Sequence, residues 1–287
     1  MGARVFGRNR RRGAVLLLVL VTMAVLFVVV GQFSYSAALD EALAHNEVRE
    51  AQATLDMQSA VAVFLRALQE DSGNRSLSVD LYTGTASISW ESEAGKFNIN
   101  TLRQEDNQTA LQRFERLFQL LEEHEIVKTL GLASKITEFV LSSRRPILAL
   151  GELLALEEVT PEVLFGNQER RGLAHYLTVY SDGSVNIGDA PPEVIAALDE
   201  GINNYKTIEL LKRKLADPKA HVPNYVEVLL KRLRDSVTTE SEAYKATITL
   251  RGRGVRREAE VAVRKEKDRY RVILYNEVDT SHERFTR

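Results

Sequence analysis

The 287-residue chain contains no cysteine, so neither a disulfide framework nor a thiolate metal site is available to it. Proline is absent from the first 145 residues, and glycine is absent between Gly31 and Gly73. Proline and glycine are the residues that most often end or weaken a helix. Their absence leaves a long N-terminal stretch with few helix breakers.

Charged side chains are missing from one long segment of this stretch. No acidic residue precedes Asp40, and no charged residue of either sign lies between Ala14 and Leu39. Roughly 20 apolar residues suffice to cross the hydrocarbon core of a bilayer, so the segment is long enough to span a membrane. The basic residues that precede it are Arg4, Arg8, Arg10, Arg11 and Arg12. Because basic flanks stay in the cytoplasm, the sequence predicts a single-pass protein with a cytoplasmic N-terminus and a body outside the cytoplasm.

Three interpretations of this N-terminus compete. A secretory signal peptide has a shorter apolar core, of about 7–15 residues, and is cut at small residues such as those of 34–38. An ordinary membrane anchor fits the length and the flanks equally well. The third interpretation depends on Gly13, which separates the arginines from the apolar run. A basic leader, a glycine and an apolar helix resemble the leader of type IV pilins and of type II secretion pseudopilins.

This resemblance implies that a prepilin peptidase cuts between Gly13 and Ala14 and that the processed chain is methylated. Residues 1–13 are then the basic leader peptide, and residues 14–38 are the transmembrane part of the N-terminal helix. The family pattern places a glutamate at the fifth mature residue, but this sequence has Leu18 there. In the family, that glutamate meets the N-terminal amine of a neighbouring subunit. A chain without it can receive the next subunit but cannot add beneath another, which implies a place at the filament tip.

The helical pattern continues beyond the membrane segment. Apolar residues recur at spacings of three and four up to Leu68, which predicts one helix from about Ala14 to Glu70. From Ser76 to Trp90, apolar and polar residues alternate on either side of a turn at 83–85, which predicts a β-hairpin.

The same alternation returns near the C-terminus. It covers 244–250, 258–264 and 270–275 and predicts three strands in a meander with one face exposed to solvent. Residues 39–100 and 239–287 are therefore expected to be two parts of one α+β domain, in which the long N-terminal helix packs on an antiparallel sheet. This arrangement matches the pilin fold.

Helical signals dominate residues 101–238, which are predicted to form a large inserted all-α domain of helix-hairpin-helix or SAM-like type. Apolar residues mark four helices, near 111–121, 136–141, 150–156 and 225–233. A motif occurs at the entry to the insert and again inside it, and its residues are Asn98, Asn100, Asn186, Pro191 and Pro192. Asp189 and Thr160, each followed by proline and glutamate, are predicted to cap helix starts. Glu91 and Glu93 are interpreted as solvated surface residues.

These features together resemble the K-type minor pseudopilin of the type II (general) secretion system over nearly the full length of the chain. The resemblance implies a tip subunit of the bacterial inner membrane, with a periplasmic body, that primes assembly of the pseudopilus and contributes to protein export across the outer membrane. The expected partners are the I and J minor pseudopilins, the major pseudopilin, the prepilin peptidase and the inner membrane. No cofactor is expected. Members of this family often bind calcium, but the sequence assigns no ligands.

The main alternative is a membrane-anchored extracytoplasmic protein that binds or takes up DNA through a helix-hairpin-helix module. Residues 185–203 resemble the start of such a module, whose Gly-apolar-Gly hairpin offers backbone N–H groups to a phosphate. Here Asn203 replaces the second glycine, and Asp199 and Glu200 precede the hairpin. Without the first thirteen residues, which hold five arginines and no acid, 33 basic and 40 acidic residues remain, a net charge of −7. A nucleic-acid binder is usually basic, so no nucleic-acid partner is predicted.

No catalytic residue is predicted either. The five histidines are dispersed, and the zinc-protease pattern that begins at His124 has Lys128 in place of its second ligand. The sequence contains no Gly-x-Ser-x-Gly elbow and no Walker-type loop. It is therefore interpreted as that of a non-enzyme.

Overall fold

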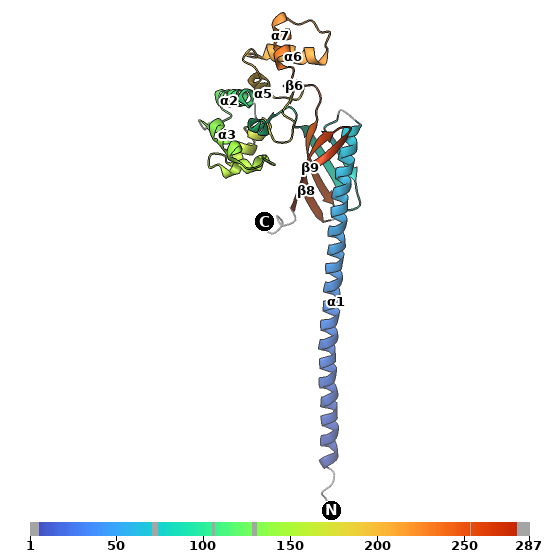
Figure 1. Ribbon diagram of the computed structural model, residues 1–287. Helices are drawn as coiled ribbons and strands as arrows, with labels where there is room; N and C mark the ends of the chain where they lie inside the picture. Colours follow the sequence, from blue (N-terminus) through green and yellow to red (C-terminus); the bar gives the residue numbers. More distant parts are fainter. Residues whose placement is uncertain (1–5, 71–73, 105–106, 128–130, 253, 280–287) are drawn as a thin grey trace, which may run out of the picture.

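The computed structural model describes residues 6–70, 74–104, 107–127, 131–252 and 254–279, with the side chains of those between residues 15 and 277. Its most prominent feature is α1, a single helix of 64 residues from Phe6 to Gln69 (Figure 1). At 1.5 Å per residue this helix is about 96 Å long. It is unbroken at Gly31 and across Ser34–Ser36, where a separate anchor would have ended, and it begins earlier than Ala14, the predicted start. The early start is compatible with the arginine-rich sequence, because arginine favours helix.

The last part of α1, from about Glu50 onward, lies against a five-stranded sheet (Figure 1). Its strands are β1 Ser76–Asp80, β2 Thr85–Ser92, β7 Ala243–Gly252, β8 Val255–Glu266 and β9 Arg269–Asp279, in the spatial order β1-β2-β7-β8-β9. All neighbouring strands are antiparallel, as the period-two pattern predicts. The pairing of β2 with β7 joins the N-terminal hairpin to the C-terminal meander.

Because buried and exposed residues alternate along the strands, one face of the sheet is apolar and forms a core with α1. In β2, every second residue is buried, and the face that packs on α1 includes Ile88 and Trp90. The helix contributes Met57 and Phe64, and the ring of Phe64 lies 5.6 Å from that of Trp90. Bringing these side chains out of water supplies the main favourable free energy for docking the helix.

Between β2 and β7 the chain forms the insert. Its helices are η1 Ile99–Arg103, α2 Gln108–Glu123, α3 Leu132–Ser142, η2 Leu150–Ala155, α4 Pro161–Phe165, η3 Leu173–His175, α5 Pro192–Ala197, α6 Tyr205–Ala216 and α7 Asn224–Leu233. Two short parallel pairs close it: β3 Phe97–Asn98 with β4 Leu177–Thr178, and β5 Val185–Asn186 with β6 Val237–Thr238. These pairs divide the insert into two halves, each of which starts and ends at a short strand.

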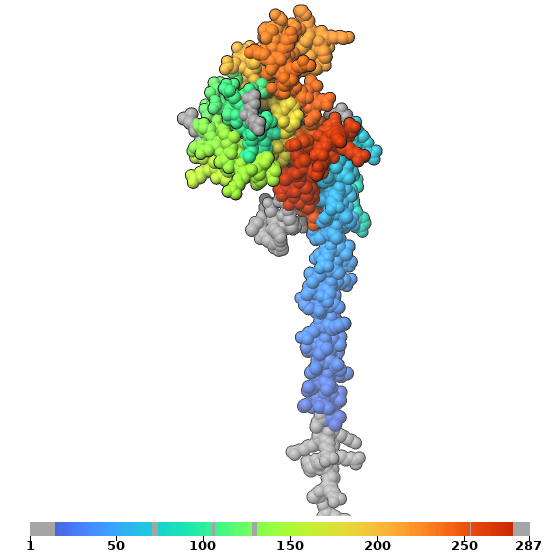
Figure 2. Space-filling view, viewed as in Figure 1, coloured from blue at the N-terminus to red at the C-terminus, as the bar shows by residue number. Residues whose placement is uncertain are grey.

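One buried apolar cluster runs through both halves of the insert. It contains Phe114 and Phe118 of α2 and reaches the sheet at Ala243, Ala262 and the half-buried Leu274. The insert is therefore packed on the sheet rather than tethered by a linker, and Figure 2 shows the two parts in contact.

The predicted fold class, an α+β pilin-like fold with a large helical insert, is confirmed. Three details differ. The helix expected near 150–156 is a 3₁₀ helix, and α6 and the two short parallel pairs were not predicted.

Candidate functional site

The apolar half of α1 is the first candidate functional surface. Within the described part of the chain, α1 is the one helix long and apolar enough to cross a membrane, with a mean hydropathy of 2.8 over its most apolar stretch and none of that stretch buried. The hydroxyl of Thr22, a rare polar group in this stretch, donates to the carbonyl of Val19 at 2.9 Å. Because this bond is internal to the helix, the hydroxyl does not need a polar partner within the bilayer.

Two of the predicted site positions lie where α1 enters this stretch. Gly13 and Ala14 are both inside the helix, and their side-chain surroundings lie outside the described residues. Leu18 follows one turn later, and its side chain is 64% exposed. A residue at this position can therefore touch a neighbouring helix, but the roles predicted for Gly13, Ala14 and Leu18 remain predictions.

A buried carboxylate fixes the other half of α1 to the hairpin. Asp56 lies among the apolar residues of the helix face and is only 4% exposed. Its Oδ2 accepts hydrogen bonds from the N–H of Thr83 at 2.7 Å and from the Thr83 hydroxyl at 2.6 Å. Burial raises the pKa of this carboxyl, but the bonds from Thr83 and Gln52 outweigh burial, so the pKa lies below its ordinary value.

An ion-pair network also joins α1 to the sheet, at positions that precede Asp56 in the helix. The guanidinium of Arg257, on β8, contacts the carboxylate of Glu50 on α1 and that of Glu277 on β9, and it donates to the Thr54 hydroxyl at 3.1 Å. The Arg257 side chain is 16% exposed, so these contacts are partly shielded from water.

The junction between sheet and insert contains a buried lysine. Lys96 Nζ donates to Glu91 and to Glu93, both at 2.7 Å. The side chains of Lys96 and Glu93 are 7% and 2% exposed, whereas that of Glu91 is 61% exposed. The interpretation of Glu93 as a solvated residue is therefore wrong, because Lys96 neutralises it inside the junction. Burial lowers the pKa of the Lys96 ammonium, but attraction to Glu93 and Glu91 outweighs it, and the net pKa is raised.

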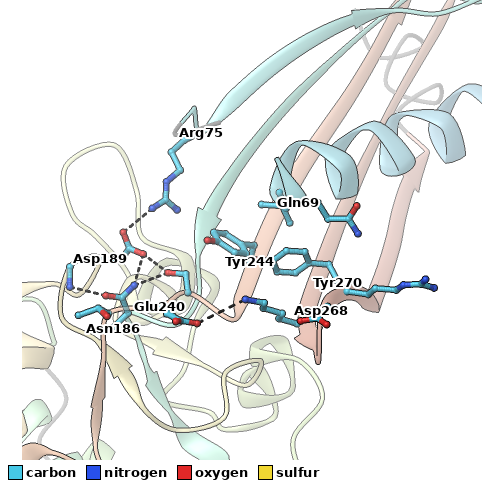
Figure 3. A pocket seen from close by; sticks show the side chains of 14 residues that line it. Gln69, Arg75, Asn186, Asp189, Glu240, Tyr244, Asp268 and Tyr270 are labelled. Atoms are coloured by element: carbon cyan, nitrogen blue, oxygen red, sulfur yellow. Dashed lines mark hydrogen bonds and ion pairs between the residues drawn. The ribbon is translucent and has the colours of Figure 1, made fainter. Parts of the chain in front are cut away.

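A second polar cluster ties the hairpin to the insert (Figure 3). Arg75 Nη2 donates to Asp189 Oδ1 at 2.8 Å, and the other oxygen of Asp189 accepts from the Ser241 hydroxyl at 2.6 Å. The predicted role of Asp189 as a helix cap is wrong, because α5 begins after Pro191 without a side-chain cap and Asp189 faces Arg75 instead. The cluster borders a polar cleft of about 980 Å³ in which the rings of Tyr244 and Tyr270 meet edge to face.

The motif asparagines have matching local roles in the two halves of the insert. Asn98 Oδ1 accepts from the N–H of Asn100 at 2.9 Å, and Asn186 Oδ1 accepts from the N–H of Gly188 at 2.9 Å. Each side chain thus turns the chain just after a short strand. Pro191 and Pro192 open α5, where a missing N–H costs nothing. At the predicted cap of α4, Thr160 accepts from the N–H of Val163 at 3.3 Å, as expected.

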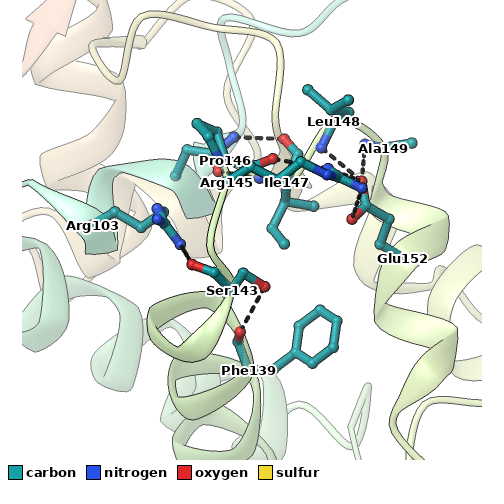
Figure 4. Close-up of polar contacts among 10 residues, drawn as sticks. Arg103, Phe139, Ser143, Arg145, Pro146, Ile147, Leu148, Ala149 and Glu152 are labelled. Carbon is teal, nitrogen blue, oxygen red and sulfur yellow. Dashed lines mark hydrogen bonds and ion pairs between the residues drawn. The ribbon is translucent and has the colours of Figure 1, made fainter.

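Further side chains hold the first half of the insert together. Arg103 donates to the carbonyls of Val140 and Ser143, which end α3, and Figure 4 shows it pointing at that helix end. Glu152 accepts from the N–H of Leu148 at 2.8 Å and pairs with Arg145 at 3.1 Å. Asn100 exchanges two hydrogen bonds with the backbone of Ile147, at 2.8 and 2.9 Å. These contacts are structural, since all their partners are groups of the insert itself.

In the hairpin that resembles a DNA-binding module, the backbone N–H of Gly201 already has an acceptor within the protein. Asp199 Oδ1 accepts from the N–H of Gly201 at 2.8 Å and also pairs with Arg232 at 3.3 Å. Ile202 is fully buried, and Asn204 caps α6 through the N–H of Thr207. A phosphate at this turn would have to displace a carboxylate from the amide it needs.

The described residues contain no group of three or more His, Cys, Asp or Glu side chains placed to hold a metal ion. The described residues therefore provide no ligand set for the calcium ion that the family resemblance suggests. Four anchoring residues were not predicted from the sequence: Asp56, Arg75, Lys96 and Arg257. A signal existed for Asp56, since a carboxylate at an apolar helix position is unusual.

No protein-family model and no curated protein matches the chain. The class to which its architecture belongs is the pilin-like one, in which a long N-terminal helix packs on an antiparallel sheet. Among solved structures it is similar to a chain of the GspK–GspI–GspJ complex from the type 2 secretion system of enterotoxigenic Escherichia coli. The TM-score is 0.57 at 13% sequence identity, and the match covers 82% of this chain and 99% of the other. The chain therefore shares its pilin-like fold with this chain of the secretion complex.

Proposed function

We propose that this protein is a minor pseudopilin of the K type, which caps the pseudopilus of a type II secretion system and primes its assembly. The observation that carries the proposal is the combination of one unbroken apolar-to-amphipathic helix with a pilin-like sheet and a packed helical insert. The similarity in fold extends over 99% of the chain of the secretion complex and so includes more than the sheet domain alone.

The membrane arrangement follows from α1. Its apolar half is placed in the bacterial inner membrane, the arginine cluster keeps the N-terminus in the cytoplasm, and the sheet and insert lie in the periplasm. A prepilin peptidase removes residues 1–13 before assembly. The new amine at Ala14 is then available to a glutamate of the next subunit, which makes the major pseudopilin a further partner.

The position at the tip is supported by two features that lie far apart. Leu18 carries no carboxylate, so this chain has no group with which to join a subunit above it. The insert lies at the opposite end of the molecule from the N-terminus (Figure 1). A repeated subunit with this insert would collide with its neighbours along a thin filament, whereas a cap has free space. Export across the outer membrane is then helped by the filament that this chain initiates.

The neighbouring structure is a complex with GspI and GspJ, so we propose that the partners of this chain are its own I-type and J-type minor pseudopilins. The functional role is then one of binding and assembly, without catalysis. No observation favours the DNA-binding alternative, because the amide of Gly201 is already bonded to Asp199.

The proposal is tested by co-expressing the full chain with the I-type and J-type pseudopilins of the same bacterium. We expect a complex with one copy of each subunit after extraction in mild detergent, measured by light scattering coupled to gel filtration. Co-expression of an unrelated single-pass periplasmic protein with the same I-type and J-type subunits is the matched control and should give no complex of three subunits. A chain that elutes as a homomer, or without both partners, contradicts the proposal.

A further inference from the structure

The part of the molecule farthest from the membrane end of α1 is a small lobe, here named the distal lobe, which consists of residues 205–235. It contains α6, α7 and the connection between them. Figures 1 and 2 show it in orange, projecting beyond the rest of the insert. Its two helices lie side by side and bury one face each, with Ile208 and Leu211 of α6 and Val226 and Leu229 of α7 in the apolar cluster of the insert, so the outward faces are left to solvent.

The distal lobe differs in charge from the rest of the protein. It holds eight Lys and Arg residues against four Asp and Glu residues, a net charge of +4. The chain without its first thirteen residues carries −7, so everything outside the lobe carries −11. Charge of one sign gathered in one exposed part of a protein steers and orients oppositely charged partners.

Most of this positive charge is not used within the molecule. Two of the basic side chains are paired, Lys214 with Glu227 and Arg232 with Asp199. Five others are exposed and form no ion pair with any residue that the structure describes: Lys206, Arg213, Lys219, Lys231 and Arg234. Structural pairing inside the lobe therefore does not explain why these residues are basic.

Large apolar side chains accompany the free charges. On α7, Tyr225 and Val228 are each 48% exposed, and the i, i+3, i+7 spacing places Arg232 on the same face. On α6, Tyr205 is 64% exposed. Tyrosine and arginine are the residues most enriched at protein interfaces, because they combine apolar contact area with polar groups.

The composition of the lobe favours a protein partner over a polyanion such as DNA. Glu209, Asp217 and Asp235 are exposed among the basic residues, and each would repel a continuous row of phosphates. A protein surface that carries carboxylates beside a few basic groups can match both signs. We propose that the distal lobe is a docking surface for an acidic protein partner, which contacts Tyr225 and Val228 and pairs its carboxylates with the free lysines and arginines. This surface goes beyond the proposed function and lies apart from the helix and sheet of the pilin-like part.

Zero-length carbodiimide coupling tests the proposal, because it joins a lysine amine only to a carboxylate in direct contact. Intact cells that produce the full chain are treated, and linked peptides are identified by mass spectrometry. We expect Lys206, Lys219 or Lys231 to be linked to Asp or Glu of another protein. The internal pair Lys214–Glu227, at 3.6 Å, provides a positive control for the reaction. If the free lysines are unlinked or form links only within this chain, the proposal is wrong.

The protein identified in this way is then purified and titrated against the full chain in detergent. The double variant Lys231→Glu/Arg234→Glu should weaken binding about tenfold or more, and the wild-type affinity should fall as salt is raised. Arg144→Glu/Arg170→Glu, which makes the same charge change at exposed positions in the first half of the insert, should bind like wild type. Equal thermal midpoints show that both variants fold.

Two results of the titration overturn the proposal. One is equal weakening by the two double variants, which would mean that only total charge matters. The other is tighter binding of duplex DNA or of anionic lipid vesicles through the same residues, which would replace the protein partner by a phosphate-bearing one. Complex formation with the I-type and J-type subunits is measured on the same variants, so a failure here is distinguishable from a failure of the proposed function.

Discussion

Asp56 of α1 and Thr83 of the β1–β2 turn are joined by two hydrogen bonds to a single carboxylate oxygen, at 2.6 and 2.7 Å. Both residues are buried, at 4% and 3% exposure. The bonds fix the position of the hairpin along the helix, which apolar contacts alone leave adjustable because they are not directional.

Replacing Asp56 by alanine should lower the free energy of unfolding by about 3 kcal/mol, because the N–H and hydroxyl of Thr83 lose a charged acceptor in a buried site. Thr83→Ser keeps both donors and should cost much less. The pKa of Asp56 is lowered in the folded protein, so its contribution is present above the ordinary value of 3.8 and is lost as the pH falls through the folded-state pKa. Urea unfolding of wild type and Asp56→Ala at several pH values checks this. A difference between the two proteins that stays constant down to the lowest pH would contradict the assignment.

Substituting Lys96 should lower the free energy of unfolding more than substituting any other charged residue of the domain junction. Lys96→Met leaves Glu93 buried without its partner, which typically costs about 3–5 kcal/mol. The double variant Lys96→Met/Glu93→Leu should recover most of that loss, because no unpaired charge remains. Glu91→Gln, at the exposed carboxylate, serves as the control and should cost less than about 1 kcal/mol. Chemical denaturation of wild type, Lys96→Met, Glu93→Leu and the double variant completes a double-mutant cycle, and a coupling energy near zero would show that the pair does not stabilise the junction.

Cleavage after Gly13 is the next expectation. Co-expression with a prepilin peptidase should shorten the chain by thirteen residues, as seen by intact mass, and Gly13→Leu should block the cut. Gly31→Leu changes another glycine of α1 that has open space around it and should leave processing unchanged. Removal of some three dozen residues instead would establish an ordinary signal peptide.

Leu18→Glu should leave the fold of the outer domain intact, because residue 18 belongs to the first part of α1, which runs away from the sheet (Figure 1). The thermal midpoint of unfolding should match that of wild type.

Immunogold labelling of sheared pseudopili that contain the wild-type chain should mark one end of each filament. Label along the shaft would show that the cap model is wrong.

Much of the fold was predictable because its elements have clear periods. The strand at 85–92 alternates strictly between buried and exposed residues, and the strand at 243–252 alternates from Lys245 to Arg251. Helix α1 has no proline or glycine to end it between residues 32 and 69. Helix α2 has a compact apolar stripe, with Phe114, Leu117 and Leu121 all buried. Such patterns are local, so the sequence alone displays them.

The polar contacts that position the insert were not predictable in the same way. Asp189 precedes two prolines and a glutamate, as a helix cap would, but its partner Arg75 lies 114 residues away. Glu93 is three residues from Lys96, a spacing that also fits a solvated pair. Which reading holds depends on whether another layer of structure covers the pair, and local sequence does not contain that information.

The pairing of β2 with β7 has a consequence for how far the insert can vary. Ser92 faces Tyr244 across the ladder, and the N–H of Glu93 bonds to the carbonyl of Ala243 at 2.8 Å. The whole of residues 94–242 therefore occupies the place of an ordinary hairpin loop. Lengthening a loop costs only about 0.6 kcal/mol per doubling of its length, and this one has an apolar core of its own to offset that cost. The length and content of the insert can therefore vary without shifting the register of β2 against β7, as long as apolar side chains still cover Ala243 and Ala262.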